Sequence, residues 1–66
     1  MRVLVNGAAR ELTPGTTVAE LLAELALAGA AVAVERNQHL VPRTEHATTA
    51  LAEGDRIELV TLVGGG

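Results

Sequence analysis

The sequence contains no cysteine, no aromatic residue and no lysine. The absence of cysteine excludes a disulfide framework, a thiolate nucleophile and a cysteine-built zinc site. Without aromatic rings the chain has nothing to stack on nucleic-acid bases. Its eight acidic residues against five arginines give a net charge of −3, which disfavours contact with phosphates. We therefore expect no nucleic-acid partner.

Long hydrophobic runs are also missing. The longest apolar stretch, residues 21–34, is interrupted by Glu24 and Gly29 and is too short to span a bilayer. No basic segment precedes an apolar run at the N-terminus, so no signal peptide is indicated. We expect a cytoplasmic protein that does not enter the membrane and that is a monomer when free.

The chain is short enough that its length restricts its function. Its 66 residues form one domain, residues 1–66. A domain of this size removes only about 60% of its unfolded-state surface from water. This leaves no room for a deep substrate cavity surrounded by catalytic groups.

The first half of the sequence predicts a hairpin followed by a helix. Residues 2–5 and 8–12 have the character of short strands, and Asn6-Gly7 between them accepts the positive φ angles of a tight turn. Thr17 and Glu20 have the spacing of a capping box, and the apolar residues that follow recur at helical spacing. We expect a helix over residues 18–28, ended by Gly29 in the left-handed conformation.

The second half predicts strands over residues 32–35, 39–41 and 56–62, with a loop containing a helical turn over residues 43–52. This order favours an α+β fold of the β-grasp, or ubiquitin-like, type. In it one helix packs on one face of a mixed four- to five-stranded sheet. The predicted core consists of Val3, Val5, Val18, Leu21, Leu22, Leu25, Val32, Val34, Ile57 and Leu59.

The sequence ends in Gly64, Gly65 and Gly66, directly after the last predicted strand. Because glycine has no Cβ, such a tail is flexible and can enter a narrow cleft in an extended form. Its terminal carboxylate is ionised at neutral pH. It can therefore attack the α-phosphate of ATP to form an acyl adenylate, although many glycine-rich ends are only disordered termini.

The whole chain resembles the sulfur carrier proteins of the ubiquitin-like superfamily, and among them the ThiS family of thiazole biosynthesis. No single motif carries the resemblance; the order, spacing and total length do. The matching segments are Val5-Asn6-Gly7, Thr17-Val18 with Leu21-Leu22, Val32-Ala33-Val34 with Asn37, Val41-Pro42-Arg43, Gly54-Asp55 and Gly65-Gly66.

The resemblance implies a carrier and not an enzyme. In the family, a ThiF-type adenylating enzyme uses ATP to activate the terminal glycine, here Gly66, while Gly64 and Gly65 enter the active site of the partner. Sulfur from a cysteine desulfurase then gives a thiocarboxylate, and a ThiG-type thiazole synthase receives the sulfur. The carrier itself binds no cofactor and no metal.

Three other functions remain open from the residues alone. The small subunit of molybdopterin synthase uses the same tail chemistry but is usually longer. A protein modifier would attach Gly66 to lysines of other proteins, and a plain ubiquitin-like interaction module would not need its tail.

Two features suggest where a partner docks. Leu4, Val60 and Leu62 fall on the sheet face opposite the helix, where exposed apolar residues would mark a binding surface unless a loop covers them. Arg43 either pairs with an acidic partner or caps a turn. His39 and His46 are expected at the surface and not as metal ligands, because they lack companion ligands at a suitable spacing. The acidic residues Glu20, Glu24, Glu35, Glu45, Glu53 and Asp55 are expected mostly on a solvated face.

Overall fold

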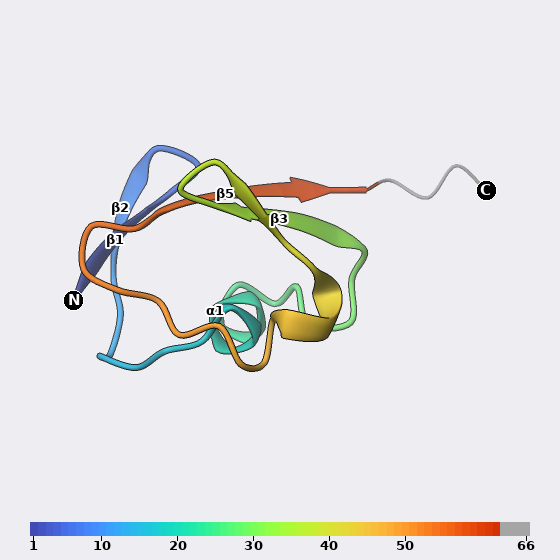
Figure 1. Ribbon diagram of the computed structural model, residues 1–66, viewed down its shortest axis with the longest axis horizontal. Helices are drawn as coiled ribbons and strands as arrows, with labels where there is room; N and C mark the ends of the chain where they lie inside the picture. The colour runs from blue at the N-terminus through green and yellow to red at the C-terminus, as the bar shows by residue number, and fades with distance from the viewer. Residues whose placement is uncertain (63–66) are drawn as a thin grey trace.

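The computed structural model describes residues 1–62, in which one helix lies against one face of a five-stranded sheet (Figure 1). The elements are β1 (Arg2–Val5), β2 (Ala8–Glu11), α1 (Val18–Glu24), β3 (Val32–Arg36), β4 (His39–Val41), the short 3-10 helix η1 (Arg43–Glu45) and β5 (Arg56–Thr61). The strand order is β2-β1-β5-β3-β4. Strands β1 and β5 are parallel, and the other neighbouring pairs are antiparallel. The predicted β-grasp fold, with its mixed sheet, is confirmed.

The core lies between α1 and the sheet. Most of the predicted core is buried, namely Val3, Val18, Leu21, Leu22, Val34 and Ile57. Four predicted core residues are only partly buried and pack around its rim: Val5, Leu25, Val32 and Leu59. The prediction missed the buried Leu12, Val41 and Leu51. Leu12 and Leu51 lie just outside regular elements and Val41 ends a three-residue strand, so no periodic pattern marks them.

Helix α1 begins where the capping box predicts. The Thr17 amide donates to Glu20 Oε1 at 2.8 Å, and the Glu20 amide donates to Thr17 Oγ1 at 3.2 Å. These bonds satisfy two donors near the start of the helix that have no partner within it.

The helix ends earlier than predicted, at Glu24 instead of residue 28. Ala26 adopts a φ of +60°, and the Leu27 amide donates to the Leu22 carbonyl at 2.7 Å. This is a Schellman ending with alanine at the position that glycine usually takes. The turn lets Leu27 pack against the core, which offsets the strain of a left-handed alanine. The prediction that Gly29 ends the helix is therefore wrong.

Both hairpin turns begin with an asparagine in the left-handed region. Asn6 and Gly7, between β1 and β2, have φ values of +50° and +84°, while Asn37 and Gln38, between β3 and β4, have +51° and +70°. Two successive positive φ angles form the turn whose twist matches that of a hairpin. The predicted Asn6-Gly7 hairpin is confirmed.

A buried carboxylate fixes the start of β5. Asp55 is 6% exposed, and its Oδ2 accepts hydrogen bonds from Arg36 Nε at 2.7 Å and the Ala52 amide at 2.8 Å. Its Oδ1 accepts a bond from Asn37 Nδ2 at 3.0 Å. Burial alone would raise the pKa of Asp55, but the bonds from Ala52, Arg36 and Asn37 together lower it below its ordinary value of 3.8.

The placement of Asp55 on the solvated face is therefore wrong, because three donors converge on a carboxylate that the fold encloses. The other acidic residues predicted on that face are exposed: Glu20, Glu24, Glu35, Glu45 and Glu53.

Candidate functional site at the end of strand β5

Strand β5 carries the chain out of the sheet at the end of the molecule opposite the N-terminus (Figure 1). The Leu62 amide donates to the Ala31 carbonyl at 2.8 Å, so hydrogen bonding on the β3 side continues to the last described residue. The predicted tail and covalent site, Gly64, Gly65 and Gly66, lie outside the described residues. The structure therefore fixes the point from which the tail starts.

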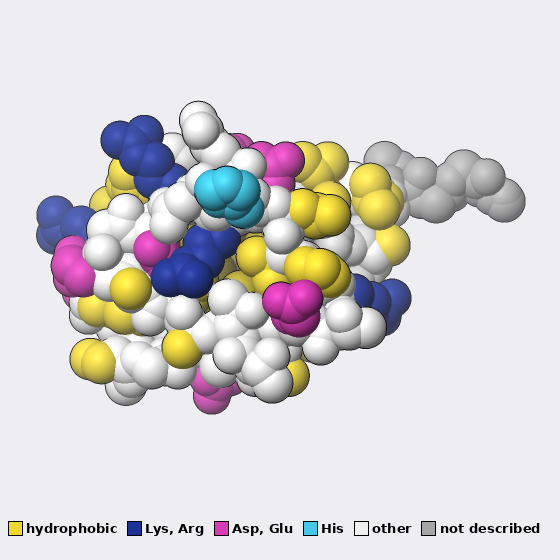
Figure 2. Space-filling view, in the orientation of Figure 1, with side chains coloured by type: hydrophobic (Ala, Val, Ile, Leu, Met, Phe, Trp, Pro, Cys, Tyr) yellow, Lys and Arg dark blue, Asp and Glu magenta, His cyan; other side chains and the backbone are white. Residues whose placement is uncertain are grey.

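The sheet face away from the helix is apolar near this point. Val60 and Leu62 are each 57% exposed, and Ala33 lies beside Val60 in the register of β3 and β5. Figure 2 shows hydrophobic side chains gathered on the side of the molecule where the grey atoms begin. We call Ala33, Val60 and Leu62 the exit patch. The predicted exposure of Val60 and Leu62 is confirmed, and their role in docking stays a prediction.

Leu4 does not belong to the exit patch. It is partly buried and pairs with Arg56 in the register of β1 and β5. Val60 lies four residues further along β5, which at the usual rise corresponds to about 13 Å. Glu58 lies between them on the same face. The register therefore divides the three-residue surface expected from the sequence, and any docking at Leu4 would be a separate contact.

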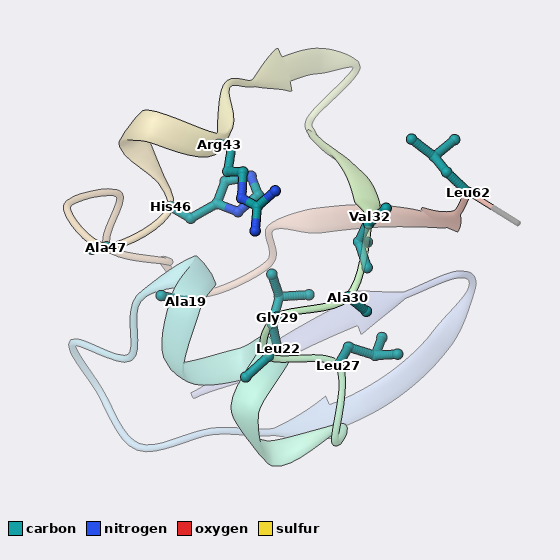
Figure 3. A pocket seen from close by; sticks show the side chains of 12 residues that line it. Ala19, Leu22, Leu27, Gly29, Ala30, Val32, Arg43, His46, Ala47 and Leu62 are labelled. Carbon is teal, nitrogen blue, oxygen red and sulfur yellow. The ribbon is translucent and has the colours of Figure 1, made fainter. Parts of the chain in front are cut away.

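Arg43 and Leu62 both line a hollow that is also lined by Leu22 of α1, so Leu62 borders this hollow as well as the exit patch (Figure 3). The hollow has a volume of about 410 Å³ and is bordered by α1, the segment that follows it, η1 and the end of β5. Arg43 and His46 supply the only polar side chains among its lining residues. Arg43 is exposed and forms no ion pair with another residue of the described chain. It is available to an acidic group, as one of its two predicted roles requires.

His46 is buried, which contradicts the prediction that it lies at the surface. It is 9% exposed, and its Nε2 lies 3.0 Å from the Val41 carbonyl oxygen. A carbonyl only accepts, so Nε2 carries the proton and donates it. The Ala19 amide donates to the His46 carbonyl at 2.9 Å. This residue therefore ties the loop after β4 to α1, a tertiary role that leaves no periodic signal in the sequence.

Among residues 1–62, the most exposed large apolar side chain is that of Leu40, which the sequence patterns did not indicate. It is 67% exposed on β4 and pairs with Glu35 of β3. Leu40 lies on the face of β4 opposite the buried Val41, but a strand of three residues is too short for alternation to indicate this from the sequence. His39 is exposed, as predicted.

Residues 1–62 contain no group of three or more His, Asp or Glu side chains arranged to hold a metal ion. Over the same residues, no helix is long and apolar enough to cross a membrane.

The fold and the site together define a class of protein. The domain has a β-grasp fold, and its last strand, β5, ends beside the exit patch. A run of glycines follows this strand in the sequence. This architecture is that of a ubiquitin-like domain.

Comparison with known proteins narrows the class to one family. The model of the ThiS family matches residues 3–66. The crystal structure of the thiamine biosynthesis protein ThiS from Geobacter metallireducens is similar over the full length of both chains, with a TM-score of 0.84 and 33% identity. The sulfur carrier protein ThiS of Escherichia coli is 38% identical over the full length of both chains. The chain belongs to the ThiS family, as its sequence predicts.

Two further relatives are much longer than this chain. Thiazole synthases from Paramagnetospirillum magneticum and Magnetococcus marinus are each 41% identical over all 66 residues, but the chain spans only 20% of the length of each. A region similar to this chain therefore occurs inside proteins that are named thiazole synthase.

Proposed function

We propose that this carrier holds its sulfur as a thiocarboxylate at Gly66. The observation that carries the proposal is that the family match runs through the glycine tail, to residue 66. The described part of the chain supports it, because β5 brings the chain to the root of this tail beside an exposed apolar patch. Glycines without Cβ atoms suit entry into a narrow channel of a partner.

The proposed chemistry explains why ATP is needed. A carboxylate is a poor electrophile, so its oxygen first attacks the α-phosphorus of ATP and expels pyrophosphate. A persulfide sulfur then attacks the carbonyl carbon of the acyl adenylate and expels AMP. A thiol finally reduces the S–S bond of the resulting acyl persulfide, and the thiocarboxylate remains on the carrier while the thiol is oxidised to a disulfide.

This chemistry assigns the chain the role of a protein co-substrate. Activation would be performed by a ThiF-type adenylating enzyme that binds the ATP, and a cysteine desulfurase would provide the persulfide. The carrier would contribute recognition and the chain end, without a cofactor of its own. Because the activation consumes ATP, we place it in the cytoplasm.

The proposed acceptor of the sulfur is a ThiG-type thiazole synthase. Support comes from the two thiazole synthases that contain a region similar to this chain. Joining a carrier to its acceptor in one polypeptide raises the local concentration of each for the other. Such an arrangement is useful when the two proteins act in succession.

The proposal is tested by the intact mass of the carrier after incubation with the cognate adenylating enzyme, ATP and a cysteine desulfurase with cysteine and a thiol. The expected result is replacement of one oxygen by sulfur, located at Gly66 by fragmentation. An unmodified chain would contradict the proposal. A Gly66 remnant on lysines of other proteins would instead identify a protein modifier.

A further inference from the structure

We propose that Asn6 is a positioning residue for the tail. Its side chain holds in place the exit end of β5, by which we mean the strand from Glu58 onward. This inference rests on the proposed function, since it concerns delivery of the Gly66 carboxylate to the adenylating enzyme. The Asn6-Gly7 pair was assigned only a turn role from the sequence, and Asn6 does more than form that turn.

Within residues 1–62, the exit end of β5 has a strand neighbour on one side only. On the β3 side, the register extends along β5 as far as Thr61. On the β1 side, the register covers only Arg56 and Ile57, because β1 ends at Val5 and the chain turns away into β2. Without another contact, β5 from Glu58 onward would therefore be bonded along one edge alone.

Asn6 provides the missing contact. The Leu59 amide donates to Asn6 Oδ1 at 2.7 Å, and Asn6 Nδ2 donates to the Leu59 carbonyl at 3.2 Å. If β1 were longer, its backbone would form hydrogen bonds with the Leu59 amide and carbonyl. The side-chain amide of Asn6 forms these two bonds instead. They join residues 53 positions apart in the sequence, and they act immediately before Val60 of the exit patch.

We call the two hydrogen bonds between Asn6 and Leu59 the clamp. It lies close to the tail in the sequence. Leu59 is three residues before Leu62, the last described residue, and Gly66 follows four residues later. A swing of β5 about its β3 edge would move both the exit patch and the root of the tail. Adenylation needs the carboxylate oxygen in line with the α-phosphorus, and errors of an ångström in such positioning slow a reaction strongly.

The molecule contains a matched control in Asn37. It occupies the same turn position with nearly the same φ, +51° against +50°. Its Oδ1 accepts from the Arg56 amide at 2.9 Å, so it clamps the start of β5 as Asn6 clamps the exit end. Loss of either side chain removes hydrogen bonds to β5, but only Asn6 lies at the exit end.

The test compares Asn6→Gly, Asn6→Asp and Asn37→Gly in the full chain, at a temperature at which thermal melts show every variant to be folded. Glycine keeps the positive φ and removes the clamp. Aspartate keeps the acceptor for the Leu59 amide and loses the donor to the Leu59 carbonyl. The measurements are ATP–pyrophosphate exchange by the cognate adenylating enzyme at varied carrier concentration, and amide hydrogen exchange of Leu59 and Leu62.

We expect Asn6→Gly to lower kcat by about tenfold through misplacement of the carboxylate, with Asn6→Asp between it and the unchanged protein. Asn37→Gly should leave kcat within about twofold. Amide exchange at Leu59 and Leu62 should speed up in Asn6→Gly and not in Asn37→Gly. Equal loss of kcat in the two glycine variants would overturn the proposal, since it would indicate a general loss of stability.

Unchanged amide exchange at Leu59 and Leu62 in Asn6→Gly would also overturn it. That readout needs no enzyme. A failure of the unchanged protein to support ATP–pyrophosphate exchange would contradict the proposed function instead, and hydrogen exchange would still decide whether Asn6 holds the exit end.

Discussion

The two ends of β5 have opposite characters, although the strand is only six residues long. At its start, Asp55 is enclosed by three donors, and Ile57 is 1% exposed against the core. At its exit end, Val60 and Leu62 are more than half exposed, and the Asn6 side chain bonds the strand on the β1 side. One strand thus packs into the core at its start and presents exposed apolar side chains at its exit end.

This difference predicts that stability and partner binding depend on different parts of this small domain. The buried contacts that hold the sheet to the helix lie around the start of β5, whereas the exposed apolar residues lie next to the tail. Changes at the start should therefore affect folding first, and changes at the exit end should affect the encounter with partners first.

The largest contrast in stability should come from two alanine substitutions in the same strand. Ile57→Ala removes a buried side chain and should cost about 2–5 kcal/mol in the free energy of unfolding, from lost transfer energy and the cavity left behind. Val60→Ala should change it by less than about 0.5 kcal/mol, because Val60 is mostly in water. Denaturant titration of both variants checks this. Similar losses would mean that the two ends do not differ as described.

A smaller loss is expected from Asp55→Asn. The substitution keeps the size of the side chain but replaces one acceptor oxygen with an NH₂ group and removes the charge that faces Arg36. It should cost about 1–3 kcal/mol at neutral pH. The matched control is Glu53→Gln, at an exposed acidic residue two positions earlier, which should be nearly neutral.

Asp55→Asn also gives a prediction for how the free energy of unfolding depends on pH. The pKa of Asp55 is lower in the folded protein than its ordinary value of 3.8, so the unfolded chain binds a proton more readily. The stability from this carboxylate is therefore fully present above about pH 4 and is lost as the pH falls through the folded pKa. The free energy of unfolding should decline below pH 4 more steeply in the unchanged protein than in Asp55→Asn. Parallel curves would show that Asp55 does not contribute to acid sensitivity.

The smallest effect on stability, with a clear effect on function, is expected from Val60→Asp. A charge in the middle of the exit patch should leave the thermal midpoint nearly unchanged but slow adenylation at limiting carrier concentration. Leu40→Asp is the control, because Leu40 is also exposed but lies on the edge strand β4. Equal adenylation rates for the two variants would contradict a role of the exit patch in binding the adenylating enzyme.

Local patterns in the sequence predicted much of this structure. The hairpin at Asn6-Gly7, the capping box of Thr17 and Glu20 and the burial of Ile57 are set by residues close together in the chain. They were confirmed because short-range chemistry decides them. The exposure of Val60 followed from the period of a half-buried strand.

The features that were missed depend on residues far apart in the sequence. Asp55 was expected on a solvated face, and only the fold brings Arg36 and Asn37 to it. The bonds from Asn6 to Leu59 have the same origin. The helix end was misplaced because the alanines and leucines after Glu24 favour a helix locally, whereas packing of Leu27 against the core decides the turn.

The central claim is that the proposed adenylation and sulfur transfer take place at the carboxylate of the glycine tail. It is tested most directly by deleting Gly65 and Gly66 together. The measurement is ATP–pyrophosphate exchange with the cognate adenylating enzyme, alongside Gly65→Val, whose β-branched side chain widens and stiffens the tail. We predict that the double deletion abolishes exchange and that Gly65→Val blocks it, both with an unchanged thermal midpoint. Exchange and sulfur transfer that persist after the double deletion would contradict the account.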